Sequence, residues 1–204
     1  MWLLFCWRLF FRPGLNRGFS LVELVVVAGI ITLLSMALIT KQNKFDSTIL
    51  LRGLAYEVAL SIRQAQIYGL SIKESAQGSG NFGVGYGIHF SSANQTSYIL
   101  FADVNGNAVY DGESESVEVF TVRRGYRIAS ACATLSSGAE RCAPGELVSL
   151  SVAFKRPDPD SLIRSDIAGE TYGSARIVIL APDGTSSRTV SVESTGQIAV
   201  EQTE

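Results

Sequence analysis

The chain has 204 residues, enough for one domain with additional segments. Its 17 Lys and Arg against 19 Asp and Glu give a net charge of −2, which excludes a general attraction to nucleic acid or to anionic lipid. The apolar residues are unevenly spread, because residues 1–40 are mostly apolar whereas the remainder is polar, rich in Gly and Ser, and long enough to bury a core.

The N-terminal 40 residues have the organisation of a membrane-inserted segment. Residues 1–18 carry only positive charges, at Arg8, Arg12 and Arg17, and residues 19–40 carry one charge, Glu23. About 20 apolar residues suffice for a helix to cross a bilayer core. Since Lys and Arg are retained on the cytoplasmic side, we expect a cytoplasmic N-terminus. The apolar start of the chain is long for a leader, which leaves open whether Met1 is the true start.

The polar stretch that ends at Gly18 precedes the apolar run, whereas a secretory signal peptide is cut after its apolar run. Cleavage after Gly18 would keep the apolar helix on the mature chain. A glycine suits such a site, because a residue without a side chain lets a peptidase approach the backbone closely. The alternatives are an uncut signal anchor and a simple turn glycine.

The helical pattern continues beyond the apolar run. In residues 45–73, apolar side chains recur at spacings of three and four, at Leu51, Leu54, Val58, Ile62 and Ala65. We predict one helix from about 20 to about 73, with residues 19–40 in lipid and residues 41–73 packed on a globular domain. Gly53 weakens the helix by about 1 kcal/mol relative to Ala, and Gly69 either does the same or lies near its end.

Residues 74–204 are predicted to form a β-rich domain. Eight runs are rich in β-branched and aromatic residues and are separated by turn signals: 84–90, 96–103, 116–124, 126–133, 147–155, 175–182, 187–194 and 197–201. Gly184 and Gly196 suit hairpin turns that need a positive φ. The predicted fold class is therefore α+β, a long helix laid against an antiparallel β-sheet domain.

One segment resembles the processing site of type IV prepilins and of type II secretion pseudopilins. It reads Gly18-Phe19-Ser20-Leu21-Val22-Glu23 and is followed by the apolar run. The resemblance implies that residues 1–18 are a leader, that a membrane aspartyl peptidase cuts after Gly18, and that the same enzyme N-methylates Phe19. It is strong over residues 14–45. Residues 54–75, 86–90 and 100–115 are more weakly similar to the pseudopilin H and FimT branch, in which a β-rich periplasmic domain follows the helix.

The resemblance implies a structural role. The residues form no catalytic constellation, so we expect no enzymatic activity, and no cofactor is expected apart from a possible Ca²⁺ ion. The chain would be a minor pilin or pseudopilin of the bacterial inner membrane, with the prepilin peptidase and other pilins or pseudopilins as partners. Type II secretion and type IV pilus biogenesis both stay open. The alternative is a binding module at a filament tip, an adhesin or DNA receptor. DNA-binding FimT-like proteins carry basic residues in the last strand and tail, whereas residues 196–204 have no Lys or Arg, so we expect no nucleic-acid binding.

Glu23 is the residue of the apolar run that most needs an explanation, because an unpaired carboxylate in a membrane helix costs roughly 2–3 kcal/mol. After cleavage, the α-amine of Phe19 lies one helical turn from Glu23. It can pair with that carboxylate or with the Glu23 of a neighbouring subunit, and a buried pair fixes register. The alternative is a carboxylate solvated at the headgroup level. Gly29 and Ser35 either allow close helix contact or are merely tolerated in a span.

Cys132 and Cys142 stand apart from the third cysteine, Cys6, which lies in the leader. In an exported chain, two such thiols predict a disulfide, and the alternative is two free thiols. A zinc site is not favoured, because His89 and two cysteines do not supply four ligands at a usual spacing. His89 lies in an alternating strand without a nucleophile motif and is interpreted as structural.

Two polar segments leave alternatives open. Side-chain oxygens alternate at Asp103, Asn105, Asn107 and Asp111, a spacing that can wrap Ca²⁺, although Asn-Gly also favours a structural turn. The basic cluster Arg123, Arg124 and Arg127 indicates either a partner or nucleic-acid contact or protective charge at a strand edge. Residues 155–160 read as a rigid polar loop.

Overall fold

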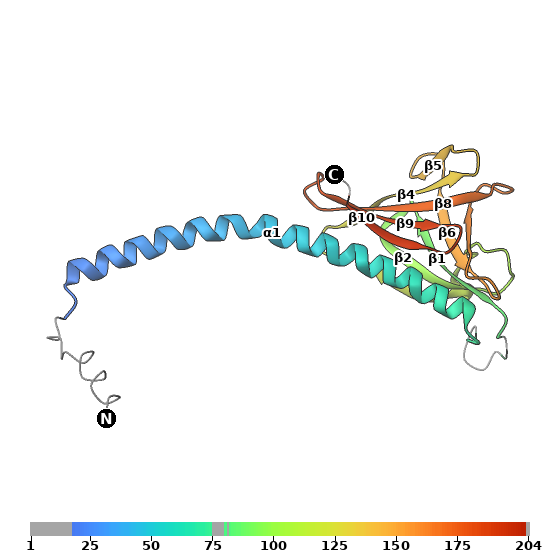
Figure 1. Ribbon diagram of the computed structural model, residues 1–204, viewed down its shortest axis with the longest axis horizontal. Coiled ribbons are helices and arrows are strands. Elements are labelled where there is room, and N and C mark those ends of the chain that lie inside the picture. Colours follow the sequence, from blue (N-terminus) through green and yellow to red (C-terminus); the bar gives the residue numbers. More distant parts are fainter. Residues whose placement is uncertain (1–17, 75–79, 81, 203–204) are drawn as a thin grey trace, which may run out of the picture. The chain divides into compact units, whose positions relative to one another are not determined.

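The computed structural model describes residues 18–74, 80 and 82–202, except for the side chains of residues 39–46 and 202. In this part of the chain a long helix, α1 (Leu21–Leu70), precedes ten strands and one 3₁₀ turn, η1 (Glu113–Glu115) (Figure 1). The chain divides into two compact units, residues 1–44 and 45–204, and α1 contributes to both. Most of the predicted leader, residues 1–17, lies outside the described residues.

Two five-stranded antiparallel sheets form the β part of the 45–204 unit. The first, sheet A, has the order β3-β2-β1-β6-β7 and consists of β1 (Gly85–Ser91), β2 (Asn94–Asp103), β3 (Ser116–Thr121), β6 (Ser149–Phe154) and β7 (Ser161–Ser165). The second, sheet B, has the order β10-β9-β8-β4-β5 and consists of β4 (Arg127–Leu135), β5 (Glu140–Ala143), β8 (Tyr172–Leu180), β9 (Ser187–Glu193) and β10 (Ile198–Gln202).

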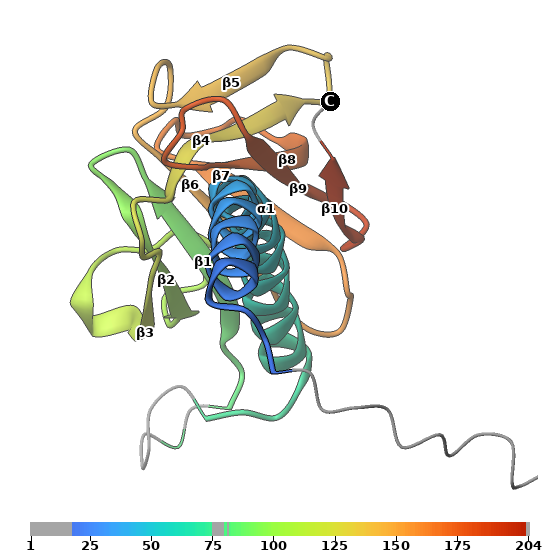
Figure 2. The same ribbon diagram turned by 90° about the vertical axis from the view of Figure 1, so that its left-hand side faces the viewer.

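Within the 45–204 unit, α1 lies between the two sheets (Figure 2). One face of the helix is buried, as its residue spacing predicts, through Leu51, Ala55, Val58, Ile62 and Ala65. These side chains belong to one continuous apolar cluster that also contains residues of both sheets. Leu54, predicted on the same face, is only half-buried and packs at the margin of this cluster.

Hydrogen bonds tie the helix to each sheet. The Ser61 and Tyr98 hydroxyls lie 3.0 Å apart and link α1 to β2. The Gln66 side-chain amide donates to the carbonyl oxygens of Gly196 and Pro159 at 3.1 and 3.2 Å. Both Ser61 and Gln66 are buried, so these bonds satisfy polar groups that water does not reach.

The helix ends earlier than its sequence predicts, at Leu70 rather than near residue 73. The cause is tertiary. An ideal Cβ on Gly69 would lie 2.2 Å from the Phe154 carbonyl oxygen of β6, so helix and strand touch backbone to backbone there. The Gly69 carbonyl also accepts a hydrogen bond from the Arg156 N–H at 3.2 Å. Gly69 is therefore a packing position near the helix end.

The eight predicted runs correspond to eight of the strands, and the predicted antiparallel β-sheet domain consists of two sheets, a division that the sequence pattern does not specify. Strands β5 and β7 were not predicted, because each is short and broken by charged residues, such as Glu140 and Arg141 in β5. The positive φ angles expected at Gly184 and Gly196 are confirmed, at 71° and 79°.

Cys132 of β4 and Cys142 of β5 lie directly opposite each other in the ladder and are joined by a disulfide. Their Cα atoms are 3.9 Å apart. The bond therefore fastens the edge strand β5 to sheet B. Since β5 is only four residues long, the cross-link offsets part of the entropy that would otherwise favour its detachment.

Candidate functional site

The start of α1 carries the residues that resemble a processing site. The helix begins at Leu21, so Gly18, Phe19 and Ser20 precede it, and all three are exposed. Glu23 lies in the first turn, where the helix dipole favours a carboxylate. Ser20 and Glu23 also have the spacing of a capping box, so Glu23 has a further structural interpretation beside pairing and solvation.

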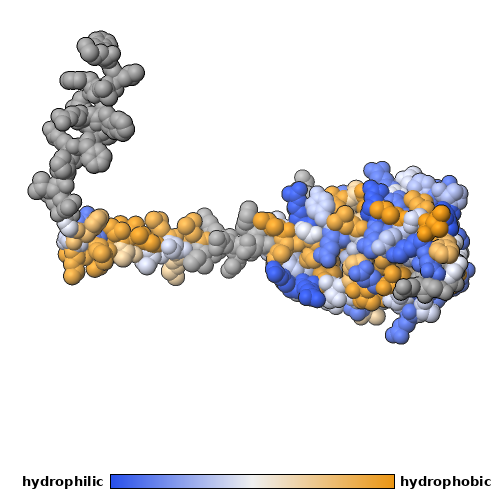
Figure 3. Space-filling model, turned by 90° about the horizontal axis from the view of Figure 1, so that it is seen from below, coloured by the Kyte–Doolittle hydropathy of each residue, from blue (hydrophilic) through white to orange (hydrophobic). Residues whose placement is uncertain are grey.

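An exposed apolar segment follows directly. Residues Leu21–Leu38 form a helical stretch long and apolar enough to cross a membrane, and none of it is buried within the structure. Figure 3 shows hydrophobic colouring over much of this segment. Glu23 is its single charged residue. The composition and the exposure are consistent with a single-pass membrane anchor.

A second apolar stripe lies on α1 within the 45–204 unit, on the face away from the core. Ile49, Tyr56, Leu60 and Ile67 follow one another at intervals of seven, four and seven residues and are 54, 47, 67 and 57% exposed. At 3.6 residues per turn they lie roughly opposite the buried stripe. Gly53 belongs to the same outer face, and nothing lies within 4 Å of its ideal Cβ. This part of α1 thus has two apolar faces, of which only the buried one was recognised in the sequence.

The candidate Ca²⁺ residues form a loop in which Asp103 binds backbone. Its Oδ1 accepts hydrogen bonds from the N–H groups of Gly106 and Asn107 at 2.8 and 3.0 Å, and its Oδ2 accepts one from Ala108 at 3.0 Å. Asp103 is 2% exposed. Glu115 closes the other side of the loop by accepting from the backbone N–H groups of Val104 and Asp111. This geometry is that of a structural turn.

The remaining candidate ligands lie on the exposed side of the loop. The side-chain amides of Asn105 and Asn107 both donate to Asp111 Oδ2, at 2.6 and 2.7 Å. The structure thus brings Asn105, Asn107 and Asp111 together, while both oxygens of Asp103 are already engaged with backbone. Ca²⁺ binding by this loop stays a proposal.

One further group of possible metal ligands includes the two cysteines of the disulfide. The ligand atoms of Cys132, Glu140 and Cys142 lie within 4.8 Å of one another, but both sulfurs are used in the disulfide. Thiolate is the form that binds metal, so this group would have to be reduced before it could act as a metal site.

His89 lies on β1 and is 8% exposed. Its Nδ1 is 3.0 Å from the Ser151 hydroxyl, and its ring centroid is 4.9 Å from that of Tyr110. Burial lowers the pKa of His89 from the ordinary 6.5 to about 4. The imidazole is therefore neutral in the folded protein at neutral pH, in keeping with a structural role.

We expect this histidine to make the protein less stable in mild acid. Between pH 6.5 and about pH 4 the unfolded chain holds a proton on residue 89 that the folded chain does not, so the free energy of unfolding falls as the pH decreases through this window. The expected loss is about 2 kcal/mol at about pH 5. Urea unfolding at about pH 7.5 and about pH 5 measures it. In His89→Gln this part of the pH dependence should vanish, and an unchanged dependence would contradict the assignment.

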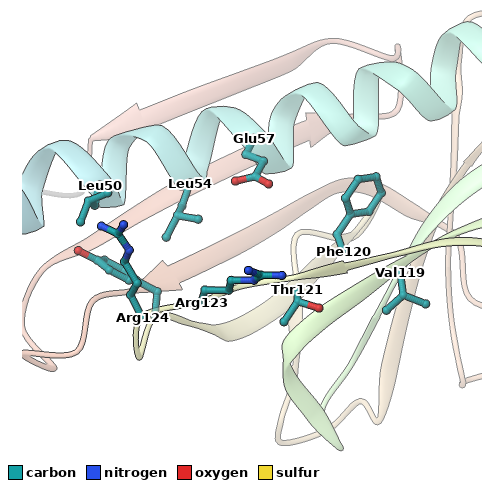
Figure 4. Close-up of a pocket in the computed structure, with 9 residues that line it drawn as sticks. Leu50, Leu54, Glu57, Val119, Phe120, Thr121, Arg123 and Arg124 are labelled. Atoms are coloured by element: carbon teal, nitrogen blue, oxygen red, sulfur yellow. The ribbon is translucent and has the colours of Figure 1, made fainter.

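A surface pocket of about 390 Å³ opens in the 45–204 unit between α1 and β3 (Figure 4). Leu50, Leu54 and Glu57 of α1 form one side. The other side is formed by the end of β3 and the turn that follows it, through Val119, Phe120, Thr121, Arg123, Arg124 and Tyr126.

Only two of the three arginines of the predicted basic cluster line the pocket. Arg123 and Arg124 line it, whereas Arg127 lies on β4 and does not. Arg124 has a positive φ of 61° and is followed by Gly125 at 78°, so the turn carries two consecutive left-handed residues. The charges are evident in the sequence, but their place beside a helix that is far away in the sequence is not.

No family model, curated protein or solved structure matches this chain.

Proposed function

We propose that the chain is a structural subunit of a type IV filament machine, a minor pilin or pseudopilin. It would be cut after Gly18, N-methylated on Phe19, and assembled through its N-terminal helix. Its place would be the bacterial inner membrane, with a periplasmic domain, and then the pilus or pseudopilus. The prepilin peptidase and other pilins or pseudopilins would be its partners.

The observation that carries the proposal is the exposed apolar segment Leu21–Leu38 directly behind Gly18-Phe19. A helix that is apolar on all sides and is not covered by any described part of its own chain must be buried by lipid or by other helices. Before assembly, lipid would bury the segment as it spans the membrane. In a filament, a bundle of such helices would bury it.

The outer stripe of α1 in the 45–204 unit supports the same proposal. Ile49, Tyr56, Leu60 and Ile67 expose apolar surface that the domain does not need for its own core. The alternation of seven- and four-residue intervals resembles the seam of packed helices. Gly53, on the same face, would let a neighbouring helix approach closely.

Two machines remain candidates, type II secretion with a pseudopilin H-like role and type IV pilus biogenesis with a FimT-like role. Neighbouring genes for a secretin-linked exporter or for pilus retraction would decide between them. A DNA receptor is the weaker candidate, because β10 and the residues that follow it carry no Lys or Arg.

Processing is the first test. When the full chain is produced together with its prepilin peptidase, we expect mass spectrometry to find a mature N-terminus of N-methyl-Phe19. Gly18→Val should abolish this product, because the side chain obstructs the close approach that glycine permits. Gly29→Ala, a change at a glycine within α1 that has an open surrounding, serves as the control and should be processed normally. Material that keeps Arg17 and Gly18 in the presence of the enzyme would contradict the proposal.

Assembly is the second test, and it separates pairing from processing. Glu23→Ala should still be cut and methylated but should enter filaments at least about tenfold less, because the α-amine of Phe19 loses its partner. Glu193→Gln, a change to an exposed glutamate at the end of β9 and outside the apolar segment, should assemble normally. Filament yield is measured in sheared or detergent-extracted fractions. Undiminished incorporation of Glu23→Ala would remove the pairing role and leave the capping-box interpretation.

A further inference from the structure

Two arginine side chains face the pocket between α1 and β3 without an ion-pair partner among the described residues. All salt bridges in that part of the chain involve Arg141 or Arg176. Arg123 and Arg124 share the pocket with one carboxylate, Glu57, so its lining has a net positive charge. Figure 4 shows the Glu57 carboxylate directed toward the space between helix and strand. The pocket thus favours an anionic occupant.

The pocket lies at an open sheet edge. Strand β3 is the terminal strand of sheet A and pairs only with β2 in the described structure. Val119 and Phe120 project from opposite faces of β3, and both line the pocket, so the pocket borders the strand's edge. The Val122 N–H donates to the Thr96 carbonyl at 2.8 Å. The alternation of an antiparallel ladder then directs the backbone groups of Val119 and Thr121 outward.

We propose that this pocket binds an extended, carboxylate-bearing peptide segment of a partner chain, which adds to the edge of β3. An extended peptide would satisfy the outward backbone groups of Val119 and Thr121, which is the way exposed edges recruit strands. Its carboxylate would pair with the guanidinium groups of Arg123 and Arg124, whose planar geometry suits such a group.

The apolar part of the lining indicates which side chains the bound peptide carries besides its carboxylates. Leu50 and Leu54 of α1 and Phe120 of β3 offer an apolar wall beside the two charges. A free anion would use the charges alone and leave this wall and the strand edge uncovered. A segment that alternates apolar and acidic side chains uses all three features, because successive side chains of an extended chain point to opposite sides. The proposal depends only on residues of the 45–204 unit and is independent of processing at Gly18.

The test uses the full chain in nanodiscs of zwitterionic lipid and fluorescence anisotropy of labelled peptides. The probe alternates valine and glutamate, and its matched control replaces each glutamate by glutamine. We expect saturable binding of the acidic probe, weakened at least about tenfold in the control peptide and in the double variant Arg123→Gln/Arg124→Gln. Arg127→Gln, a neighbouring arginine outside the pocket, should bind the probe like the unaltered protein. Thermal unfolding of each variant verifies that the fold is intact.

A third probe separates strand addition from charge attraction. An acidic peptide N-methylated at alternate amides keeps its charges but cannot form the ladder, so it should bind at least about tenfold more weakly. Equal binding of this peptide would overturn strand addition. No saturable signal up to about 1 mM probe, equal loss in Arg127→Gln, or full displacement by an equal concentration of inorganic phosphate would each overturn the proposal, the last by revealing a simple anion site.

Discussion

Replacing Gly69 with alanine is expected to destabilise the globular unit by about 3 kcal/mol or more, the upper end for overpacking a core. The added Cβ would lie 2.2 Å from the carbonyl oxygen and 2.8 Å from the carbonyl carbon of Phe154. Both are backbone atoms. They cannot move aside easily, because Phe154 lies in β6, the strand between β1 and β7 in sheet A. The helix end must therefore move away from the sheet. Urea unfolding of the full chain in detergent micelles measures the change.

Gly53→Ala is the matched control, because it makes the same chemical change in the same helix. Its added Cβ meets nothing within 4 Å, so only the helix propensity changes. We expect a gain of about 1 kcal/mol in the free energy of unfolding. Opposite signs for the two variants would show that close packing against Phe154, and not helix propensity, decides the role of Gly69. Tolerance of Gly69→Ala at the level of the unaltered protein would refute the backbone contact.

Replacing Asp103 with alanine is the second change with a large expected effect. Its carboxylate accepts three backbone hydrogen bonds, from residues 106, 107 and 108, and is almost wholly buried. Removing it leaves three N–H groups of a tight loop without their partner, and one hydrogen bond to a charged group contributes about 1.5–3 kcal/mol. We expect a loss of about 3 kcal/mol or more in the free energy of unfolding, measured by urea denaturation without Ca²⁺.

Asp111→Asn provides the comparison within the same loop. Asp111 accepts only from the exposed amides of Asn105 and Asn107, so its change should cost less than about 1 kcal/mol in the absence of Ca²⁺. Adding Ca²⁺ distinguishes a purely structural turn from a loop that binds the metal. If the loop binds Ca²⁺, millimolar Ca²⁺ should raise the melting temperature of the unaltered protein and not that of Asp111→Asn. Equal melting temperatures with and without Ca²⁺, together with no heat in a calorimetric titration, would leave the loop a purely structural turn.

Several features of this protein follow from local sequence alone. The apolar run behind Gly18, the helix from residue 45 to residue 70, eight of the strands, and the positive φ angles at Gly184 and Gly196 each depend on residues close together in the chain. Hydrophobic periodicity and turn-forming residues act over a few positions, so they can be recognised without knowing which distant residues they contact. Cys132 and Cys142 were paired for a similar reason, since only nine residues separate them.

The tertiary structure decided what depends on contacts between distant residues. Gly69 was expected either to weaken the helix or to lie near its end, and it does lie near the end, but the reason is its contact with Phe154, which is far away in the sequence. The pocket joins α1 near residue 50 to β3 and the turn beyond it, and it separates Arg123 and Arg124 from Arg127. Short strands such as β5 are stabilised by the ladder and the cross-link that hold them, not by their own propensity. The sequence shows which residues are apolar or charged. Which residues they contact is determined only by the packing of the two sheets with the helix.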